Sequence, residues 1–278
     1  MAAITAQAVK ELRELTDLPM MDVKKALVDA DGDQARAIEL LKERNKKVML
    51  KRLENATSEG LIRVGVSADG STGAMVEIQC ESAPVAKADD FLFLADQLVK
   101  QLLSGPGATT PEELLAQPAP DRAGQKLSDL LEEVVGKIRE KMVVARVLRV
   151  EGPVGAYAHH DGKTGVLFRA AGDAKVVPVL KDVAMHIAAL KPLVTQPDEL
   201  QASEVAAERD RLTTEAAASG KPANIVEKIV EGRMKTYYAE NGVLAFQLFA
   251  KDDSKTVSQA LAESGLKASG FTRWILGN

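Results

Sequence analysis

The sequence is poor in residues that several common classes of function require. Cys80 is the only cysteine in 278 residues, so the chain can form neither an internal disulfide nor a cysteine-rich zinc site, which is typical of a reducing compartment. Aromatic residues make up only 4% of the chain, and the net charge is −4. Proteins that bind nucleic acid usually carry a basic excess and, for single strands, clustered aromatic side chains. We therefore expect no direct nucleic-acid partner.

Long apolar runs are also missing. No segment approaches the roughly 18 consecutive apolar residues of a transmembrane helix, and the stretch MAAITAQAVKELREL carries acidic residues too early for a signal peptide. These features predict a soluble, cytoplasmic protein without a membrane partner. A hydrophobic content of 46% is ordinary for a globular protein, and the length is typical of about two domains.

The motifs of nucleotide binding and of common hydrolases are absent as well. Gly162-Lys163-Thr164 matches the end of a phosphate-binding loop, but Tyr157 stands where that motif requires its first glycine. No HExxH, GxSxG or CxxC sequence occurs. We predict a protein that has no cofactor or metal of its own and is not an enzyme of covalent chemistry.

The histidines and the cysteine fit structural roles at least as well as chemical ones. His159 and His160 are adjacent at the end of a predicted strand, so we expect them to point to opposite faces and not to share a metal ion. We interpret His186, among apolar neighbours, as a packing residue, and Cys80 as a half-buried strand residue. For His159 the two interpretations are balanced, because a histidine between a strand and a turn is exposed and can meet a partner.

The stretch from Leu12 to Leu41 is the most informative part of the chain and predicts short helices separated by tight turns. Thr16-Asp17-Leu18-Pro19 can end one helix and begin the next, because proline fits a first helical turn but disfavours helix before it. Gly32 can end the second helix, and Asp33 can cap the third. Apolar residues at helical spacing could close a very small core: Val9, Leu12, Leu15, Val23, Leu27, Ile38 and Leu41. A unit of this size has no room for a buried active site and indicates a docking module.

The rest of the chain repeats a rhythm of strands followed by helices. Residues 61–80 predict a β-hairpin, and helices follow at 86–103, 112–115 and 125–140. A second β-rich unit is predicted from the strands MVVARVLRVEG, VGAYAHH and GVLFRAAG, with a helix at 177–190. The segment LKASGFTRWIL is expected to return and pair with this second sheet.

Two helical segments, 198–218 and 224–238, are joined by SGKP and predict a helical hairpin. Their thin apolar stripe favours a protruding, coiled-coil-like arm, and the alternative is a hairpin packed flat on the sheet. We thus predict an α+β fold: a three-helix module at 1–55, a first α+β subdomain at 56–141, and a second at 142–278 that includes the arm at about 193–240. Each subdomain is expected to be an antiparallel sheet covered on one side by helices.

MMDVKKAL followed by DADGDQARAIELL resembles the ubiquitin-associated-type N-terminal domain of the elongation factor Ts family, the bacterial guanine-nucleotide exchange factors of elongation factor Tu. The resemblance continues in the family's order through EIQCESAPVAKADDF, VGAYAHHDGKTGVLF, VAMHIAALKP, SGKP, EGRMK and DDSKTV. It implies a ubiquitin-associated-like module, two similar α+β subdomains and a GTPase, elongation factor Tu, as the partner.

The resemblance also implies site residues. In the family, a Cys-x-Thr-Asp-Phe-Val tip enters the GTPase near its nucleotide and helps to dislodge the magnesium ion. Here the tip is Ser82, Ala83, Pro84 and Val85 after Cys80-Glu81, so both the carboxylate and the aromatic wedge are missing. Phe91 is close by, but we assign it to the core of the following helix. The other positions that match partner-binding residues of the family are Met20, Met21, Lys24, Lys87 and His159.

Alternatives stay open for some of these positions, because Met20 or Met21 can belong to the core and Lys24 can be an ordinary surface lysine. The resemblance implies that the chain binds elongation factor Tu–GDP and promotes exchange of GDP for GTP by disturbing the magnesium and phosphate site. Each tenfold loss of nucleotide affinity requires about 1.4 kcal/mol of differential contact energy, so several docking regions are expected. The altered tip leaves a second possibility, a non-catalytic binding or stabilising partner of the same GTPase.

Overall fold

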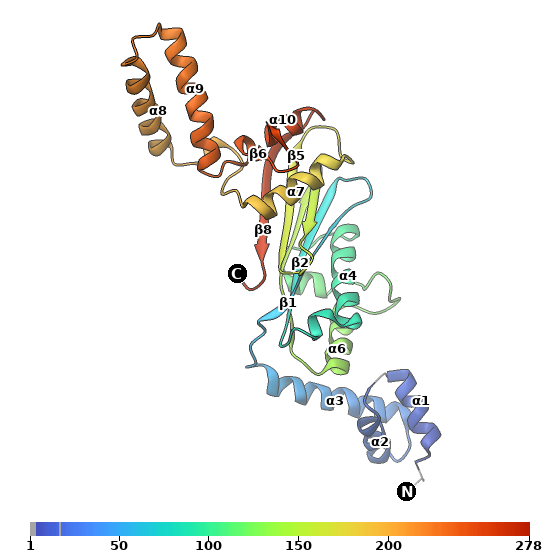
Figure 1. The fold of residues 1–278 in the computed structure, drawn as a ribbon. Helices are drawn as coiled ribbons and strands as arrows, with labels where there is room; N and C mark the ends of the chain where they lie inside the picture. Colours follow the sequence, from blue (N-terminus) through green and yellow to red (C-terminus); the bar gives the residue numbers. More distant parts are fainter. Residues whose placement is uncertain (1–3, 17) are drawn as a thin grey trace.

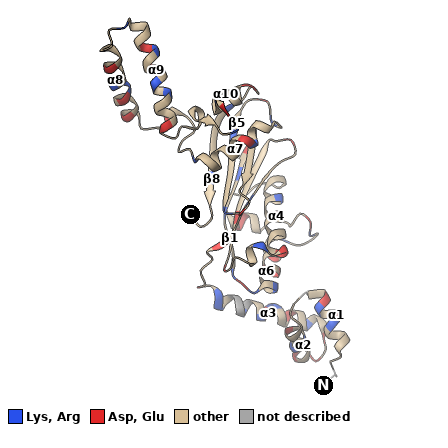
Figure 2. Ribbon diagram, viewed as in Figure 1, with Lys and Arg blue, Asp and Glu red and all other residues tan. Residues whose placement is uncertain are grey.

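The computed structural model describes residues 4–16 and 18–278, so Asp17, one residue of the helix break expected at Thr16 to Pro19, lies outside the described residues. The molecule is elongated (Figure 1), with a helical module at the N-terminal end, two sheets with their helices in the middle, and a helical hairpin at the far end. Basic and acidic residues both occur along its length (Figure 2). No helix in the described ranges is long and apolar enough to cross a membrane.

The N-terminal module consists of three helices, α1 (Ala6–Thr16), α2 (Met20–Asp29) and α3 (Gln34–Arg52). The predicted N-cap of α3 is confirmed, because the Asp33 side chain accepts a hydrogen bond from the Arg36 amide at 3.1 Å. The small core contains most of the expected residues and some others: Val9, Leu12, Leu18, Val23, Ala26, Leu27, Ala37 and Leu41. The prediction for Leu15 is wrong, because its side chain points away from this core and is 69% exposed.

The first sheet contains β1 (Glu59–Val66), β2 (Thr72–Cys80) and β3 (Met142–Glu151), all antiparallel and in that order. The assignment of the strand from Met142 to the second sheet is therefore wrong. This strand pairs with β2 along its length, and Met142 and Val144 complete the apolar face that the helices cover. A boundary between 141 and 142 would divide this sheet, since the chain passes to the second sheet only at 152–153.

Helices cover one face of the first sheet. After the short helix η1 (Val85–Lys87) come α4 (Asp89–Ser104), α5 (Pro111–Leu115) and α6 (Leu127–Ile138). Phe91 is fully buried at the start of α4, which confirms its assignment to the core. This packing leaves the short segment between β2 and α4 at one end of the sheet, where the tip lies.

The second sheet has the order β4 (Val154–Ala158), β5 (Thr164–Ala171) and β8 (Lys267–Ile275). The C-terminal segment pairs with β5, as the sequence predicted. The core beneath this sheet is closed by α7 (Pro178–Leu190), the short helix η3 (Leu244–Phe246), the strands β6 (Leu248–Phe249) and β7 (Asp252–Thr256), and α10 (Val257–Ala262). His186 on α7 is buried, lies 2.9 Å from Gln247 Oε1 and accepts a hydrogen bond from the Ala250 amide, which confirms its packing role.

The two sheets pack face to face through a second apolar layer, which contains Ile62 and Met75 from the first sheet and Leu167 from the second. A Cβ atom at Gly165 would lie 2.4 Å from Ile62 Cγ2, so only glycine allows this close approach of the sheets. The middle of the molecule is therefore layered as helices, sheet, sheet and helices. This arrangement brings the ends of β1, β2 and β4 together.

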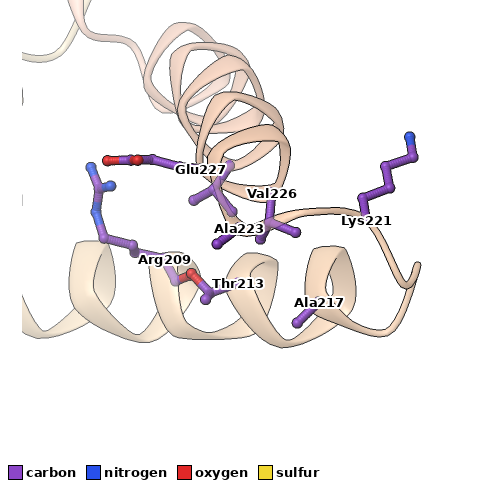
Figure 3. A pocket seen from close by; sticks show the side chains of 8 residues that line it. Arg209, Thr213, Ala217, Lys221, Ala223, Val226 and Glu227 are labelled. Atoms are coloured by element: carbon purple, nitrogen blue, oxygen red, sulfur yellow. The ribbon is translucent and has the colours of Figure 1, made fainter.

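The arm is formed by α8 (Ala202–Ala217) and α9 (Ala223–Glu240), which follow the short helix η2 (Pro197–Glu199). It projects from the body (Figure 1), so the prediction of a protruding hairpin is confirmed and the alternative of a flat hairpin is wrong. Leu212, Val230 and Met234 form its buried stripe. Near the SGKP turn a cleft of about 460 Å³ lies between the helices (Figure 3), lined by Thr213 and Ala217 of α8 and by residues of α9.

Candidate functional site

The tip, Ser82 to Val85, joins β2 to η1 and is held from inside the protein. The Glu140 carboxylate accepts hydrogen bonds from the Ser82 amide at 3.0 Å and from the Ser82 hydroxyl at 2.7 Å. Val85 is buried in the core of the first subdomain. Ala83 and Pro84, between these two anchors, are exposed and present a small apolar corner.

The residue before the tip connects it to the N-terminal module. The Glu81 carboxylate accepts hydrogen bonds from the Lys141 amide at 2.6 Å, from Arg52 at the end of α3, and from Asn55 at 2.7 Å. Burial raises the pKa of Glu81, but these hydrogen bonds outweigh it and hold the pKa below its ordinary value. The carboxylate is therefore an anchor that joins α3 to the base of the tip.

Cys80 is structural. Its side chain is fully buried, so the prediction of a half-buried residue is wrong, and its thiol donates to the Ser82 carbonyl at 3.3 Å. Burial raises the pKa of this thiol to about 11, which leaves it protonated at neutral pH. The only cysteine thus has neither the access nor the charge of a nucleophile.

Residues 159–163, which we call the histidine turn, follow β4. His159 Nδ1 lies 3.1 Å from Asp161 Oδ1, and the ring centres of His159 and His160 are 4.2 Å apart. The prediction that these rings point to opposite faces is wrong, because β4 ends at Ala158 and strand alternation no longer applies. The Lys163 amide, together with His159, lowers the pKa of the Asp161 carboxyl. Among the residues that the structure describes, no group of three or more His, Cys, Asp or Glu side chains could hold a metal ion.

A groove of about 770 Å³ runs between the tip and the histidine turn. Ala83 and Lys87 lie on one wall and His159 on the other, so the structure brings together three of the residues singled out in the sequence. The floor is the start of β1, where the Ile62 amide donates to the Gly162 carbonyl at 2.7 Å. Glu59 also lines the groove, and its carboxylate lies 3.2 Å from Lys163 Nζ. No local pattern in the sequence signals this contact, because the two residues are far apart in the chain. The Asp-Gly-Lys sequence predicted the position of the histidine turn in the chain, but not that this turn faces the tip across the groove.

The remaining predicted residues lie on α2 of the N-terminal module, which Figure 1 shows apart from the two sheets. Met20 and Met21 on α2 are 54% and 72% exposed, so the alternative that either belongs to the core is wrong. Lys24 is exposed on the same helix. Asp22, beside these methionines, forms an ion pair with Arg139 at the end of α6, and this contact joins the module to the first subdomain.

Comparisons with known proteins cover the whole chain. A family model described as "Elongation factor TS" matches residues 81–278. The protein of Paenarthrobacter aurescens named Elongation factor Ts is 41% identical, and the match covers 100% of both chains. Proteins of the same name from Hyphomonas neptunium and Bordetella petrii are each 40% identical over 100% of this chain and over 93% and 92% of their own lengths. Because this identity extends over the whole chain and the family model matches residues 81–278, the chain belongs to the elongation factor Ts family.

Proposed function

We propose that this protein binds elongation factor Tu in its GDP-bound form in the cytoplasm and promotes release of GDP and its exchange for GTP. Membership of the family implies a role in translation elongation. The observation that supports the finer proposal is the groove, which is lined both by Lys87, in the short helix after β2, and by His159, in the turn after β4, beside the exposed corner of the tip. Both residues match positions through which the family grips its GTPase.

The proposed mechanism uses binding energy rather than covalent chemistry. A factor that binds more tightly to a GTPase with a displaced magnesium and phosphate site must weaken nucleotide binding. By reciprocity, bound nucleotide weakens binding of the factor by the same ratio. A large loss of nucleotide affinity requires several kcal/mol of differential contact energy. One loop is too small an interface to provide it. The exposed methionines of α2 and the groove are separate surfaces on this elongated molecule, and together they are suited to such an extended interface.

In this proposal the tip acts by shape. Ala83 and Pro84 offer neither a carboxylate nor an aromatic ring, but they are exposed on a segment that Glu140 and Val85 hold in place. A rigid apolar corner can displace the backbone of the partner's nucleotide loop. Lys87 and His159 then supply polar contacts on either side of it.

A second candidate function follows from the same corner. Because Ala83 and Pro84 stand where the family has Asp and Phe, the protein can instead be a partner that grips and stabilises the GTPase without accelerating exchange. This candidate predicts tight binding with an unchanged GDP release rate. It keeps the α2 surface and the groove as contacts but removes the role of the tip.

Stopped-flow fluorescence separates the two candidates. Elongation factor Tu loaded with a fluorescent GDP analogue is mixed with excess unlabelled GDP, with and without this protein at a tenth of the GTPase concentration. An exchange factor at that ratio accelerates release from the whole GTPase population, because each molecule acts repeatedly. Binding confirmed by calorimetry together with an unchanged release rate would reject exchange and leave the stabilising role.

A further inference from the structure

A buried carboxylate stands in the layer between the two sheets, outside the candidate site. Glu77 lies on β2 two residues after Met75, on the face turned toward the second sheet, and its side chain is 2% exposed. Its Oε2 accepts a hydrogen bond from Arg146 Nε at 2.7 Å. Its Oε1 accepts from Gln79 Nε2 at 2.7 Å and from the Gly277 amide at 3.0 Å. One carboxylate therefore joins β2, β3 and the chain that follows β8.

Arg146 extends this contact along the end of the second sheet. Its Nη2 donates to the Ile275 carbonyl at 2.8 Å, and its guanidinium carbon lies 4.4 Å from the centre of the Trp274 ring. A charge-assisted hydrogen bond from Nε, a second hydrogen bond from Nη2 and stacking on an aromatic face together restrict this planar guanidinium to one orientation. Glu77 and Arg146 thus clamp residues 274–277, which we call the C-terminal strap, to the middle of the first sheet.

The strap lies next to the histidine turn. Ile275 is paired with Thr164, the first residue after the turn, and the Leu276 amide donates to the Lys163 carbonyl at 2.9 Å. The opposite side of the turn is bonded to β1 through the Ile62 amide. The turn that carries His159 is therefore held between β1 and the strap.

The hydrogen bonds of Glu77 and Arg146 fix the relative orientation of the two sheets in a way that apolar contacts would not. A buried ion pair stabilises a fold little compared with well-packed apolar side chains, because desolvation offsets the attraction. Its hydrogen bonds are directional, however, and they define how one sheet is placed on the other. We propose that Glu77 and Arg146 are positioning residues, which act through the strap to fix the His159 wall of the groove relative to the wall formed by Ala83 and Lys87. The consequence for exchange rests on the proposed function, whereas the placement of the turn can be measured on the protein alone.

The first test is amide hydrogen exchange on the full chain without a partner. Glu77→Gln keeps the size of the side chain but removes its charge, and Trp274→Leu removes the ring that stacks on Arg146. We expect exchange at Ile62, Gly162 and Leu276, the amides that hold the turn and the strap, to become about tenfold faster in both variants. The matched control is Asp182→Asn, which breaks the ion pair with Lys251 inside the second subdomain.

Unchanged protection of these amides in the two clamp variants would overturn the proposal, and so would an equal loss in the control. Trp274 is half-exposed, so Trp274→Leu decides the question even if Glu77→Gln fails to fold. This readout does not involve the GTPase, so it holds whether or not the protein accelerates GDP release.

The second test measures coupling in the GDP-release assay. Glu77→Gln and His159→Ala are each expected to slow release, and the double variant is expected to be no slower than His159→Ala alone, because both changes act through the same wall. Multiplied losses in the double variant would show that Glu77 acts on overall stability and not on His159. Absence of acceleration by the unmodified chain would instead contradict the proposed function and leave the hydrogen-exchange result standing.

Discussion

The tip offers the sharpest test of the proposed mechanism, because a single carboxylate, Glu140, anchors its first residue. Glu140 accepts both hydrogen bonds from Ser82, and the neighbouring Ala83 and Pro84 are exposed. Glu140→Ala removes this support without touching the exposed corner itself. We expect the corner to sample many conformations in the variant, of which few fit the partner.

The size of the effect follows from the two hydrogen bonds. A hydrogen bond to a charged group contributes about 1.5–3 kcal/mol when it is well shielded from water. Glu140 is only partly buried, so we take about 2 kcal/mol for the pair of bonds, which shifts the conformational equilibrium by about 30-fold. When only a fraction of molecules is competent to bind, the apparent affinity falls by that fraction. The concentration for half-maximal exchange should therefore rise by up to about 30-fold.

The assay is stopped-flow release of fluorescent GDP at increasing concentrations of the factor. Glu132→Ala is the matched control, because Glu132 is an exposed glutamate on α6, the helix that precedes Glu140 in the chain. Ser82→Ala, which removes only the hydroxyl, should give an intermediate loss. Melting temperatures of all variants establish that the chain stays folded.

Two results would refute this reasoning. In the first, Glu140→Ala shows the same concentration dependence of GDP release as the unmodified protein, although its tip amides exchange hydrogen with solvent faster. The conformation of the tip would then not control GDP release. If Glu132→Ala loses as much activity as Glu140→Ala, the effect comes from α6 and not from Ser82.

Further predictions address the other surfaces. Restoring the family's pair with Ala83→Asp and Pro84→Phe should raise the maximal GDP-release rate, and an unchanged rate would remove the tip from the mechanism. Met21→Asp should weaken GTPase binding in calorimetry by about 1–3 kcal/mol, whereas Val176→Asp, an equally exposed apolar position on the second subdomain, should leave it unchanged. Burial lowers the pKa of His186, so the unfolded chain binds a proton more readily than the folded one. The free energy of unfolding should therefore fall as the pH drops from 7.5 through about 6.5, and His186→Gln should flatten this dependence in urea titrations.

Much of the fold follows from local signals in the sequence. The three N-terminal helices, the hairpin of β1 and β2, the arm and the C-terminal strand were all predicted, because caps, turns and apolar periodicity act over a few residues. Gly32 and Asp33 define one helix boundary by their own backbone and side-chain preferences. The family resemblance likewise lies in short motifs whose order the sequence displays directly.

The tertiary structure alone decided which of these elements meet. Met142 begins a strand that precedes β4 in the chain, yet it pairs with β2, because hydrogen-bonded edges and apolar faces are matched across long separations. The same packing placed His159 across a groove from Ala83 and Lys87 and brought Glu77 against the last residues of the chain. The sequence by itself determined the family and the elements, since both are written in local patterns. The groove and the clamp depend on how two sheets pack, a property of the whole chain that no short segment contains.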